Sequence, residues 1–360
     1  MVEQMVKVVE ERGRGTRGGP YVYVVEGDEL VHISEYAAKK LEYEDKAVYE
    51  VPRSKLVGKI IYCFEFSRSG GRFLIKCGID DFEDGRPKRC EHAEFSEIRN
   101  LRFLVNNPTL KHLLRQFEGV FIPIINELKE YERALNFEIL FMGHQSRLRD
   151  AYEDPELYYF TFMSLPKDRS RISSLKVTRR WLYQVWLLKL VCEALGVSKF
   201  KLHEWEGKPF WWIEQGSELI TSVAETPFGD VTFWLEFQPS KYAHMIGILT
   251  EKRVPIRPDI VVVKGCFRRT RDFVDSKKPI DLIIECKEDP FNKWRREINS
   301  QILPYQEAFK PRNFIVASLE PVPVKEKKYL ERQGIKVVDN LKPKSENIRM
   351  LHSIIESVSL

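Results

Sequence analysis

Three charged side chains at the ends of two apolar stretches have the types and spacing needed for phosphodiester chemistry. Asp259 precedes the apolar run 260–263, and Glu285 and Lys287 interrupt the apolar run 280–287. Alternate residues of a strand point to one face, so Glu285 and Lys287 are expected on the same face. Buried charges are costly unless they are paired or bind a cation. Two carboxylates can hold a hard divalent ion that polarises a phosphate oxygen and lowers the pKa of bound water. The lysine can orient that water, help to deprotonate it or offset phosphate charge.

The order Pro258-Asp259, then Glu285-Cys286-Lys287, resembles the motif of the PD-(D/E)xK nuclease superfamily. The resemblance implies an α/β fold with a restriction-endonuclease-like core, in which a mixed central sheet is flanked by helices. It also implies a Mg²⁺ or Mn²⁺ site formed by Asp259, Glu285 and the backbone carbonyl of Cys286. Lys287 completes the catalytic group in such a site.

A second motif follows on the helix expected to start at Asp289-Pro290, with Asp289 as the N-cap and Pro290 at the first helical position. Gln301 and Tyr305 are four residues apart, so they share one helix face. The pattern Gln-x-x-x-Tyr after the strand resembles the additional motif of the RecB-like branch, and we include both residues in the catalytic set. Pro304 predicts a kink in the same helix.

The segment 177–195 is apolar on nearly every side, which predicts a buried helix ending at Gly196. Within it, Tyr183-Gln184-Val185-Trp186 is similar to the Tyr-Glu-x-Trp helix that opens the nuclease core of McrC-type proteins. In that family the glutamate adds a third acid. Gln184 cannot supply an anionic ligand but can still form hydrogen bonds, and this departure bears on metal affinity.

Basic residues near these motifs could contact a phosphate backbone. We expect this role for Arg179 and Arg180 at the helix start and for Arg257 beside Asp259. The loop 264–278, interpreted as lying beside the metal site, adds Arg268, Arg269 and Arg271. Solvated loop charge remains an alternative explanation for these loop residues.

The surrounding elements are predicted to position this site. Strands at 314–317 and 335–338 and a helix at 324–333 follow the helix that carries Gln301. The order strand–strand–helix–strand–helix–strand is the one expected of the nuclease core. Antiparallel strands are predicted within 209–237 and a last helix at 345–358. A buried salt bridge in an ordinary α/β sheet is the alternative reading of the charged residues.

Three consecutive segments are expected: a β-rich domain (1–105), a helical connector (106–165) and a nuclease domain (166–360). The first contains apolar strands at 21–25, 30–33, 59–66 and 72–79, with a short helix at 34–41 and a turn at 69–71 between the last two strands. Cys63, Cys77, Cys90 and His92 lack zinc-knuckle spacing, so core cysteines are favoured over a zinc site.

The 360 residues are 43% hydrophobic and 31% charged, and the net charge is +5, which favours a globular protein and permits nucleic-acid binding. No apolar run suggests a membrane span, and the N-terminus lacks a signal-peptide pattern. The six cysteines occur mostly in apolar segments, which favours reduced thiols in the cytoplasm.

We therefore expect a metal-dependent DNA endonuclease or exonuclease in restriction or repair. A DNA-binding protein of the same fold without activity is an alternative. A structural or interaction protein with an accidental motif is another. DNA is the expected partner, and no membrane contact is expected. Because a P-loop motif is lacking, any ATP-driven step would require a separate ATPase or helicase. A homodimer remains open.

Overall fold

The computed structural model describes residues 3–12, 18–66, 72–141, 146–165, 167–201, 204–205, 207–213, 222–237 and 257–357. The described chain has a mixed α/β architecture and divides into two compact units. Unit 1 comprises residues 1–115 and 153–175, and unit 2 comprises residues 116–152 and 176–360. The three consecutive segments expected from the sequence are thus replaced by two interleaved units, because the chain leaves unit 1 and returns to it.

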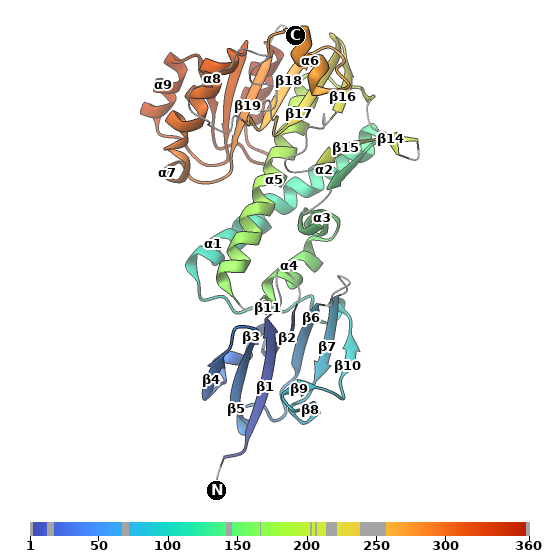
Figure 1. The fold of residues 1–360 in the computed structure, drawn as a ribbon, viewed down its shortest axis with the longest axis vertical. Coiled ribbons are helices and arrows are strands. Elements are labelled where there is room, and N and C mark those ends of the chain that lie inside the picture. The colour runs from blue at the N-terminus through green and yellow to red at the C-terminus, as the bar shows by residue number, and fades with distance from the viewer. Residues whose placement is uncertain are drawn as a thin grey trace. The chain divides into compact units, whose positions relative to one another are not determined.

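Unit 1 is built on one sheet, whose described strands pair antiparallel except for β11 and β3, which pair in parallel (Figure 1). Its path is β10–β7–β6–β2–β1–β5–β4, with β3 beside β2 and β11 beside β3. The strands are β1 (Met5–Arg12), β2 (Gly18–Glu26), β3 (Glu29–His32), β4 (Lys39–Glu42), β5 (Lys46–Pro52), β6 (Ile61–Phe66), β7 (Arg72–Cys77), β10 (Glu91–Ala93) and β11 (Arg102–Phe103). A separate pair is formed by β8 (Phe82–Glu83) and β9 (Arg86–Pro87).

The apolar strands predicted in the N-terminal region are present, but two expectations there are wrong. The segment 34–41 forms a 3-10 turn at Ile33–Glu35 and then enters β4, because Lys39–Glu42 pairs with β5. Cys77 and Cys90 form a disulfide, because the pairing of β7 with β10 brings their Cα atoms to 5.0 Å. Cys63 is buried in the core, as expected. The predicted turn at 69–71 lies outside the described residues.

Unit 2 contains a seven-stranded mixed sheet in the order β13–β16–β17–β18–β19–β20–β21. Neighbours from β13 to β19 are antiparallel, whereas β19, β20 and β21 are parallel. The central strands are apolar over most of their length because both faces of the sheet are covered. The strands are β13 (Lys199–Phe200), β16 (Ser222–Thr226), β17 (Gly229–Leu235), β18 (Ile260–Lys264), β19 (Leu282–Lys287), β20 (Asn313–Ser318) and β21 (Ile335–Val338).

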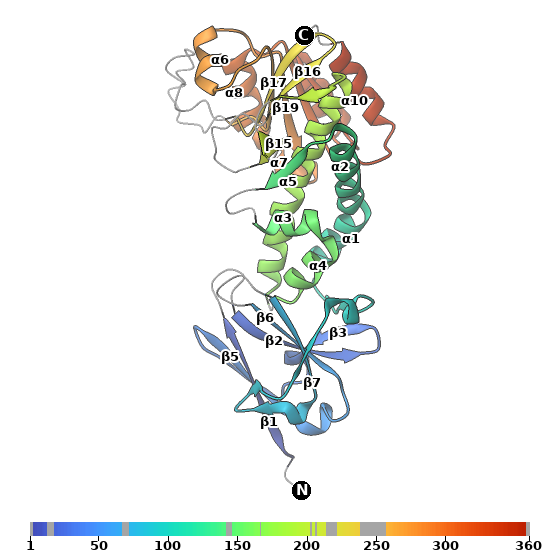
Figure 2. The same cartoon turned by 90° about the vertical axis from the view of Figure 1, so that its right-hand side faces the viewer.

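Helices lie on both sides of this sheet, and Figure 2 shows α8 and α10 on opposite sides. The helices of unit 2 are α2 (Ile122–Leu135), α3 (Ser146–Glu153), α6 (Thr270–Ser276), α7 (Phe291–Trp294), α8 (Leu303–Phe309), α9 (Val324–Arg332) and α10 (Asn347–Glu356). A smaller sheet in the order β12–β15–β14 is formed by β12 (Glu138–Phe141), β15 (Lys208–Ile213) and β14 (Glu204–Trp205). The strand predicted near residue 209 therefore belongs to this smaller sheet.

Three of the described helices contain residues of both units: α1 (Pro108–Gln116), α3, whose last residue Glu153 belongs to unit 1, and α5 (Asp168–Ala194). Helix α4 (Pro155–Met163) lies wholly within unit 1. The part of α5 within unit 2 is buried on nearly every side, as its apolar composition predicts. Among the described residues, none of the helices combines the length and apolar character needed to cross a bilayer.

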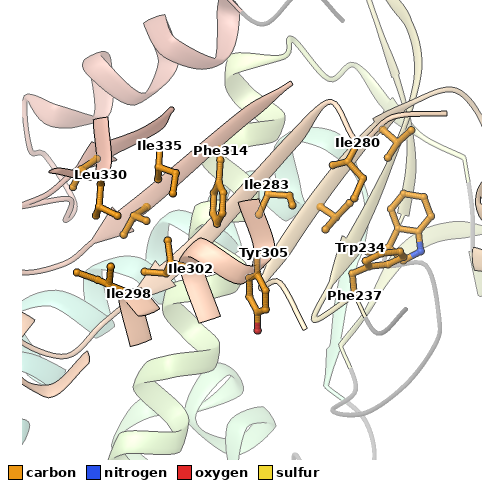
Figure 3. Packing of buried hydrophobic residues seen from close by; sticks show 14 of the residues in the cluster. Trp234, Phe237, Ile280, Ile283, Ile298, Ile302, Tyr305, Phe314, Leu330 and Ile335 are labelled. Carbon is orange, nitrogen blue, oxygen red and sulfur yellow. The ribbon is translucent and has the colours of Figure 1, made fainter. Parts of the chain in front are cut away.

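One face of the seven-stranded sheet packs against α8 and the helical turns before it (Figure 3). Ile283 and Phe314 of the sheet meet Ile298, Ile302 and Tyr305 in this cluster. The helix predicted after Pro290 is interrupted, because α7 ends at Trp294 and a π-helical turn at Ile298–Ile302 precedes Pro304. Pro290 occupies the N-cap position without a side-chain cap, so the expected Asp289 cap is wrong.

Candidate active site

The register of two strands brings the predicted acids together. β18 and β19 are antiparallel, with Ile260 opposite Ile284, so Asp259 and Glu285 lie at the same edge of the sheet. The backbone N–H of Cys286 donates a hydrogen bond of 2.8 Å to Oδ2 of Asp259. Asp259 is 4% exposed and Glu285 is 3% exposed. Two carboxylates are thus fixed side by side in a place where water screens them poorly.

Lys287 is held between two carboxylates. Its Nζ lies 2.8 Å from Oε1 of Glu285 and 2.6 Å from Oε2 of Glu297. Burial alone would lower the pKa of Lys287, but the charges of Glu285, Asp259 and Glu297 outweigh burial and raise it. Lys287 is therefore an ammonium ion at neutral pH in this arrangement, and it serves as a fixed positive charge.

Glu285 has one paired and one unpaired carboxylate oxygen. Oε1 accepts the hydrogen bond from Lys287, whereas Oε2 is buried without a hydrogen-bond partner. Burial, and then the charge of Asp259, raise the pKa of Glu285, although Lys287 opposes both effects. An unpaired buried carboxylate oxygen is costly.

Gln184 takes part in the same cluster from α5. Its Nε2 donates a hydrogen bond of 2.7 Å to Oδ1 of Asp259, and the side chain is fully buried. Its Oε1 is also buried without a hydrogen-bond partner. The amide therefore satisfies Asp259 by a hydrogen bond and adds no charge to the cluster.

Gln301 and Tyr305 both line the cavity beside the acids, but they differ in burial. Gln301 is partly exposed and lies in the π-helical turn. Tyr305 is 2% exposed, and its ring belongs to the apolar cluster of Figure 3. Its hydroxyl accepts a hydrogen bond of 3.1 Å from the backbone N–H of Arg257. Tyr305 therefore supports the chain just before Asp259.

The cavity at this edge has a volume of about 500 Å³. Its lining combines carboxylates, cations and aromatic rings. The lining residues are Arg180, Arg257, Asp259, Glu285, Cys286, Lys287, Glu288, Asp289, Lys293, Trp294, Glu297, Gln301 and Tyr305. All five residues of the predicted catalytic set and the three predicted metal-binding residues are therefore at one cavity.

Two of the arginines expected to bind phosphate also line this cavity. Nη2 of Arg180 lies 3.0 Å from Oε1 of Glu236 and 3.6 Å from Oδ1 of Asp259. Nη1 of Arg257 lies 3.3 Å from Oε2 of Glu236. Burial lowers the pKa of Arg180, but the charges of Asp259 and Glu236 raise it overall. Both guanidinium groups therefore flank the acids at the cavity wall.

Arg179 is placed differently from this expectation. It is 1% exposed, its Nη2 donates a hydrogen bond of 2.9 Å to the backbone oxygen of Glu288, and its guanidinium lies over the ring of Phe121. The residue is enclosed by the fold because successive residues of a helix point in different directions, and Arg180 alone faces the cavity. The expectation that Arg179 contacts a phosphate is therefore wrong, because its guanidinium is buried.

Arg268, Arg269 and Arg271 are not beside the acids. The connection from β18 to β19 leaves the sheet at Lys264, at the opposite end of both strands from Asp259 and Glu285. A hairpin connection lies at one strand end only, so this loop cannot border a site at the other end. Arg269 also pairs with Asp272 at 2.7 Å. The expectation that this loop borders the metal site is wrong.

Three acids of the site were not singled out from the sequence. Glu236 follows β17, Glu288 follows β19, and Glu297 precedes Gln301 by four residues. Burial raises the pKa of Glu288 to about 7. Glu297 shares a helix face with Gln301, and Glu236 interrupts the apolar segment Phe233-Trp234-Leu235-Glu236-Phe237. Both patterns were visible signals, because a charge inside an apolar run requires a partner.

Within the described residues, no three His, Cys, Asp or Glu side chains are gathered so that they could hold a metal ion. The expected site uses two carboxylates and a backbone carbonyl, which is a different ligand set. Comparison of the chain with protein-family models, with curated proteins and with solved structures finds no match.

Proposed function

We propose that unit 2 contains a PD-(D/E)xK nuclease core and that the protein hydrolyses phosphodiester bonds in DNA with the help of Mg²⁺ or Mn²⁺. The proposal is supported most directly by one observation. Asp259, Glu285 and Lys287, which come from two different strands, meet at one edge of a mixed sheet in a cavity. A buried salt bridge would explain Glu285 and Lys287, but it would not explain a second carboxylate beside them.

The residues present fit a hard divalent cation. Asp259 and Glu285 offer carboxylate oxygens, Cys286 lines the same cavity, and Oε2 of Glu285 is buried without a partner. Oxygen donors of this kind are the preferred ligands of Mg²⁺ and Mn²⁺. When bound, the ion would polarise a phosphate oxygen and acidify a bound water. Gln184 leaves the site with one charge fewer than the family it resembles.

The protein's own groups have separate roles in this proposal. Lys287, which its carboxylate neighbours keep protonated, offsets the charge of the phosphate that is attacked. Arg180 and Arg257 contact phosphate oxygens from the cavity wall. Gln301 orients a water molecule or a phosphate oxygen through its amide. These groups bind, orient and neutralise, which are the main demands of phosphodiester hydrolysis.

A DNA-binding protein of the same fold without activity is the second candidate. Gln184 in place of an acid, and the 3.6 Å approach of Arg180 to Asp259, favour it, because both reduce the negative charge available to a cation. The intact Asp259, Glu285 and Lys287 favour the enzyme. Cleavage separates the two candidates.

The proposal is tested by incubating the full-length chain with linear, circular, single-stranded and branched DNA. Each substrate is combined with Mg²⁺, Mn²⁺ or EDTA. We expect cleavage of at least one form with a divalent ion and none with EDTA. Binding without cleavage under every condition would favour the inactive DNA-binding protein, and absence of both would contradict the nuclease proposal altogether.

A further inference from the structure

A buried carboxylate behind the cavity is shared by two cavity arginines. Glu236 has a side chain that is 2% exposed, whereas the side chains of Arg180 and Arg257 are 40% and 30% exposed. Glu236 is not among the residues that line the cavity, and both arginines are. The carboxylate therefore cannot reach a substrate itself, but the two guanidinium groups that it contacts can.

Each oxygen of Glu236 faces a different arginine. Oε1 accepts a hydrogen bond of 3.0 Å from Nη2 of Arg180. Oε2 lies 3.3 Å from Nη1 of Arg257, as an ion pair that is not aligned as a hydrogen bond. A guanidinium has five N–H donors, so most donors of both arginines remain for another acceptor.

The backbone at Glu236 gives an independent reason to ascribe a role to this side chain. Its φ is 49°, in the left-handed region that few residues other than glycine adopt. The conformation is fixed because the backbone N–H of Glu236 donates a hydrogen bond of 2.7 Å to the backbone oxygen of Asp259. A glycine would adopt it without strain, so a buried glutamate at this position is a costly choice.

We propose that Glu236 is a positioning residue that holds Arg180 and Arg257 together as a fork for one phosphate group of a nucleic-acid strand. The inference rests on the proposed function, because it assigns a phosphate subsite to the same cavity. Paired guanidinium groups match the oxygens of a phosphate, and holding them in place beforehand reduces the entropy lost on binding. The fork lies next to Asp259, so the phosphate it binds is at or beside the bond to be cut.

The test measures DNA binding in EDTA, so cleavage is not needed. The affinity of the full-length chain for a short labelled duplex is followed against salt concentration for the parent, Glu236→Ala and Glu236→Gln. Each lost phosphate contact should lower the log–log slope by roughly 0.9. We expect Glu236→Ala to release both arginines from the one phosphate that they share and to lower the slope by roughly 0.9. Glutamine keeps one carbonyl acceptor, so Glu236→Gln should lower the slope by less than Glu236→Ala does.

The sign of the effect separates positioning from charge alone. If Glu236 acted only as a negative charge, its removal would tighten DNA binding, whereas the fork predicts weaker binding. Glu225→Gln removes an exposed glutamate that pairs with Lys201, the residue after the neighbouring strand β13, and it should leave the slope unchanged. In the background Arg180→Ala with Arg257→Ala, the further change Glu236→Ala should have no effect.

Several results would overturn the inference. The first is an unchanged slope in both Glu236 variants. The second is a further fall of the slope when Glu236→Ala is added to the double variant Arg180→Ala with Arg257→Ala. The third is failure of the parent to bind either the duplex or inorganic pyrophosphate. Circular dichroism melting checks folding, and Glu236→Gln carries the test if Glu236→Ala does not fold. A chain that binds through the fork but never cleaves would refute the nuclease and leave the inference standing.

Discussion

Asp259 and Glu285 are equally buried, yet the fold satisfies their charges differently. Asp259 accepts two hydrogen bonds, from Gln184 and from the backbone of Cys286. Glu285 accepts one, from Lys287, and keeps an unpaired oxygen. Hydrogen bonds to the ionised form favour ionisation, while burial opposes it. Under the nuclease proposal, we therefore expect a proton and the cation to compete for Glu285.

This difference predicts a pH dependence of stability without metal. The folded state raises the pKa of Glu285 from 4.5 to about 7, through burial first and then through Asp259. An acidic group whose pKa is higher in the folded state than in the unfolded state stabilises the fold at a pH below its unfolded-state pKa. This contribution is lost as the pH rises through the folded-state pKa. In EDTA, we expect the free energy of unfolding of the parent to fall relative to that of Glu285→Gln between about pH 5 and pH 8. Denaturant titrations measure the difference. A difference that is constant or rises would contradict this assignment.

Gln184 gives the second prediction for a single residue. In Gln184→Glu, a carboxylate would face Oδ1 of Asp259 at the position where the amide of Gln184 now donates a hydrogen bond of 2.7 Å. Without metal the two like charges should repel, so the melting temperature in EDTA should fall. With Mn²⁺ the added charge should strengthen binding, by roughly tenfold for a change among groups that support a metal. Calorimetric titration with Mn²⁺ measures the affinity, and weaker binding would show that Gln184 does not face the metal.

At the level of elements, the strands of the site were the most predictable part. β18, β19, β20 and β21 coincide with the apolar runs because a sheet covered on both faces needs continuous apolar strands. The antiparallel register of β18 and β19 then places Asp259 beside Glu285. The composition of the basic loop 264–278 could not predict where the loop lies. Its position follows from the direction of β18, because the loop starts at the end of β18 that is opposite to Asp259.

The helical segment after β19 separates a site residue from a core residue. Gln301 is partly exposed at the cavity, whereas Tyr305 is buried in the apolar cluster. We expect Gln301→Ala to lower the cleavage rate by roughly ten- to a hundredfold, as for groups that orient a metal-bound ligand, with little change in melting temperature. Gln333→Ala, an exposed glutamine after α9, is the matched control. A Gln301 variant that melts early but cleaves at the parental rate would make Gln301 a structural residue.

For the whole molecule, composition and patterning predicted a mixed α/β protein with a β-rich N-terminal part. They could not predict where the chain returns, so residues 153–175 were separated from the unit to which they belong. The same limit hid the disulfide, because Cys77 and Cys90 meet only through the pairing of β7 with β10. Glu236 became visible as a partner of Arg180 and Arg257 only in three dimensions. Sequence patterns could not predict contacts between residues that are far apart in the chain.

The most direct test of the nuclease proposal compares the full-length parent with Asp259→Asn and Glu285→Gln on a DNA substrate that the parent cleaves in Mg²⁺. Both variants keep the size of the side chain and remove one ligand charge. Several kcal/mol of transition-state stabilisation depend on such an ion, so the rate should fall by at least about a thousandfold. Glu225→Gln should cleave like the parent, and circular dichroism should show that all four chains are folded. Cleavage at the parental rate by either site variant would contradict the account.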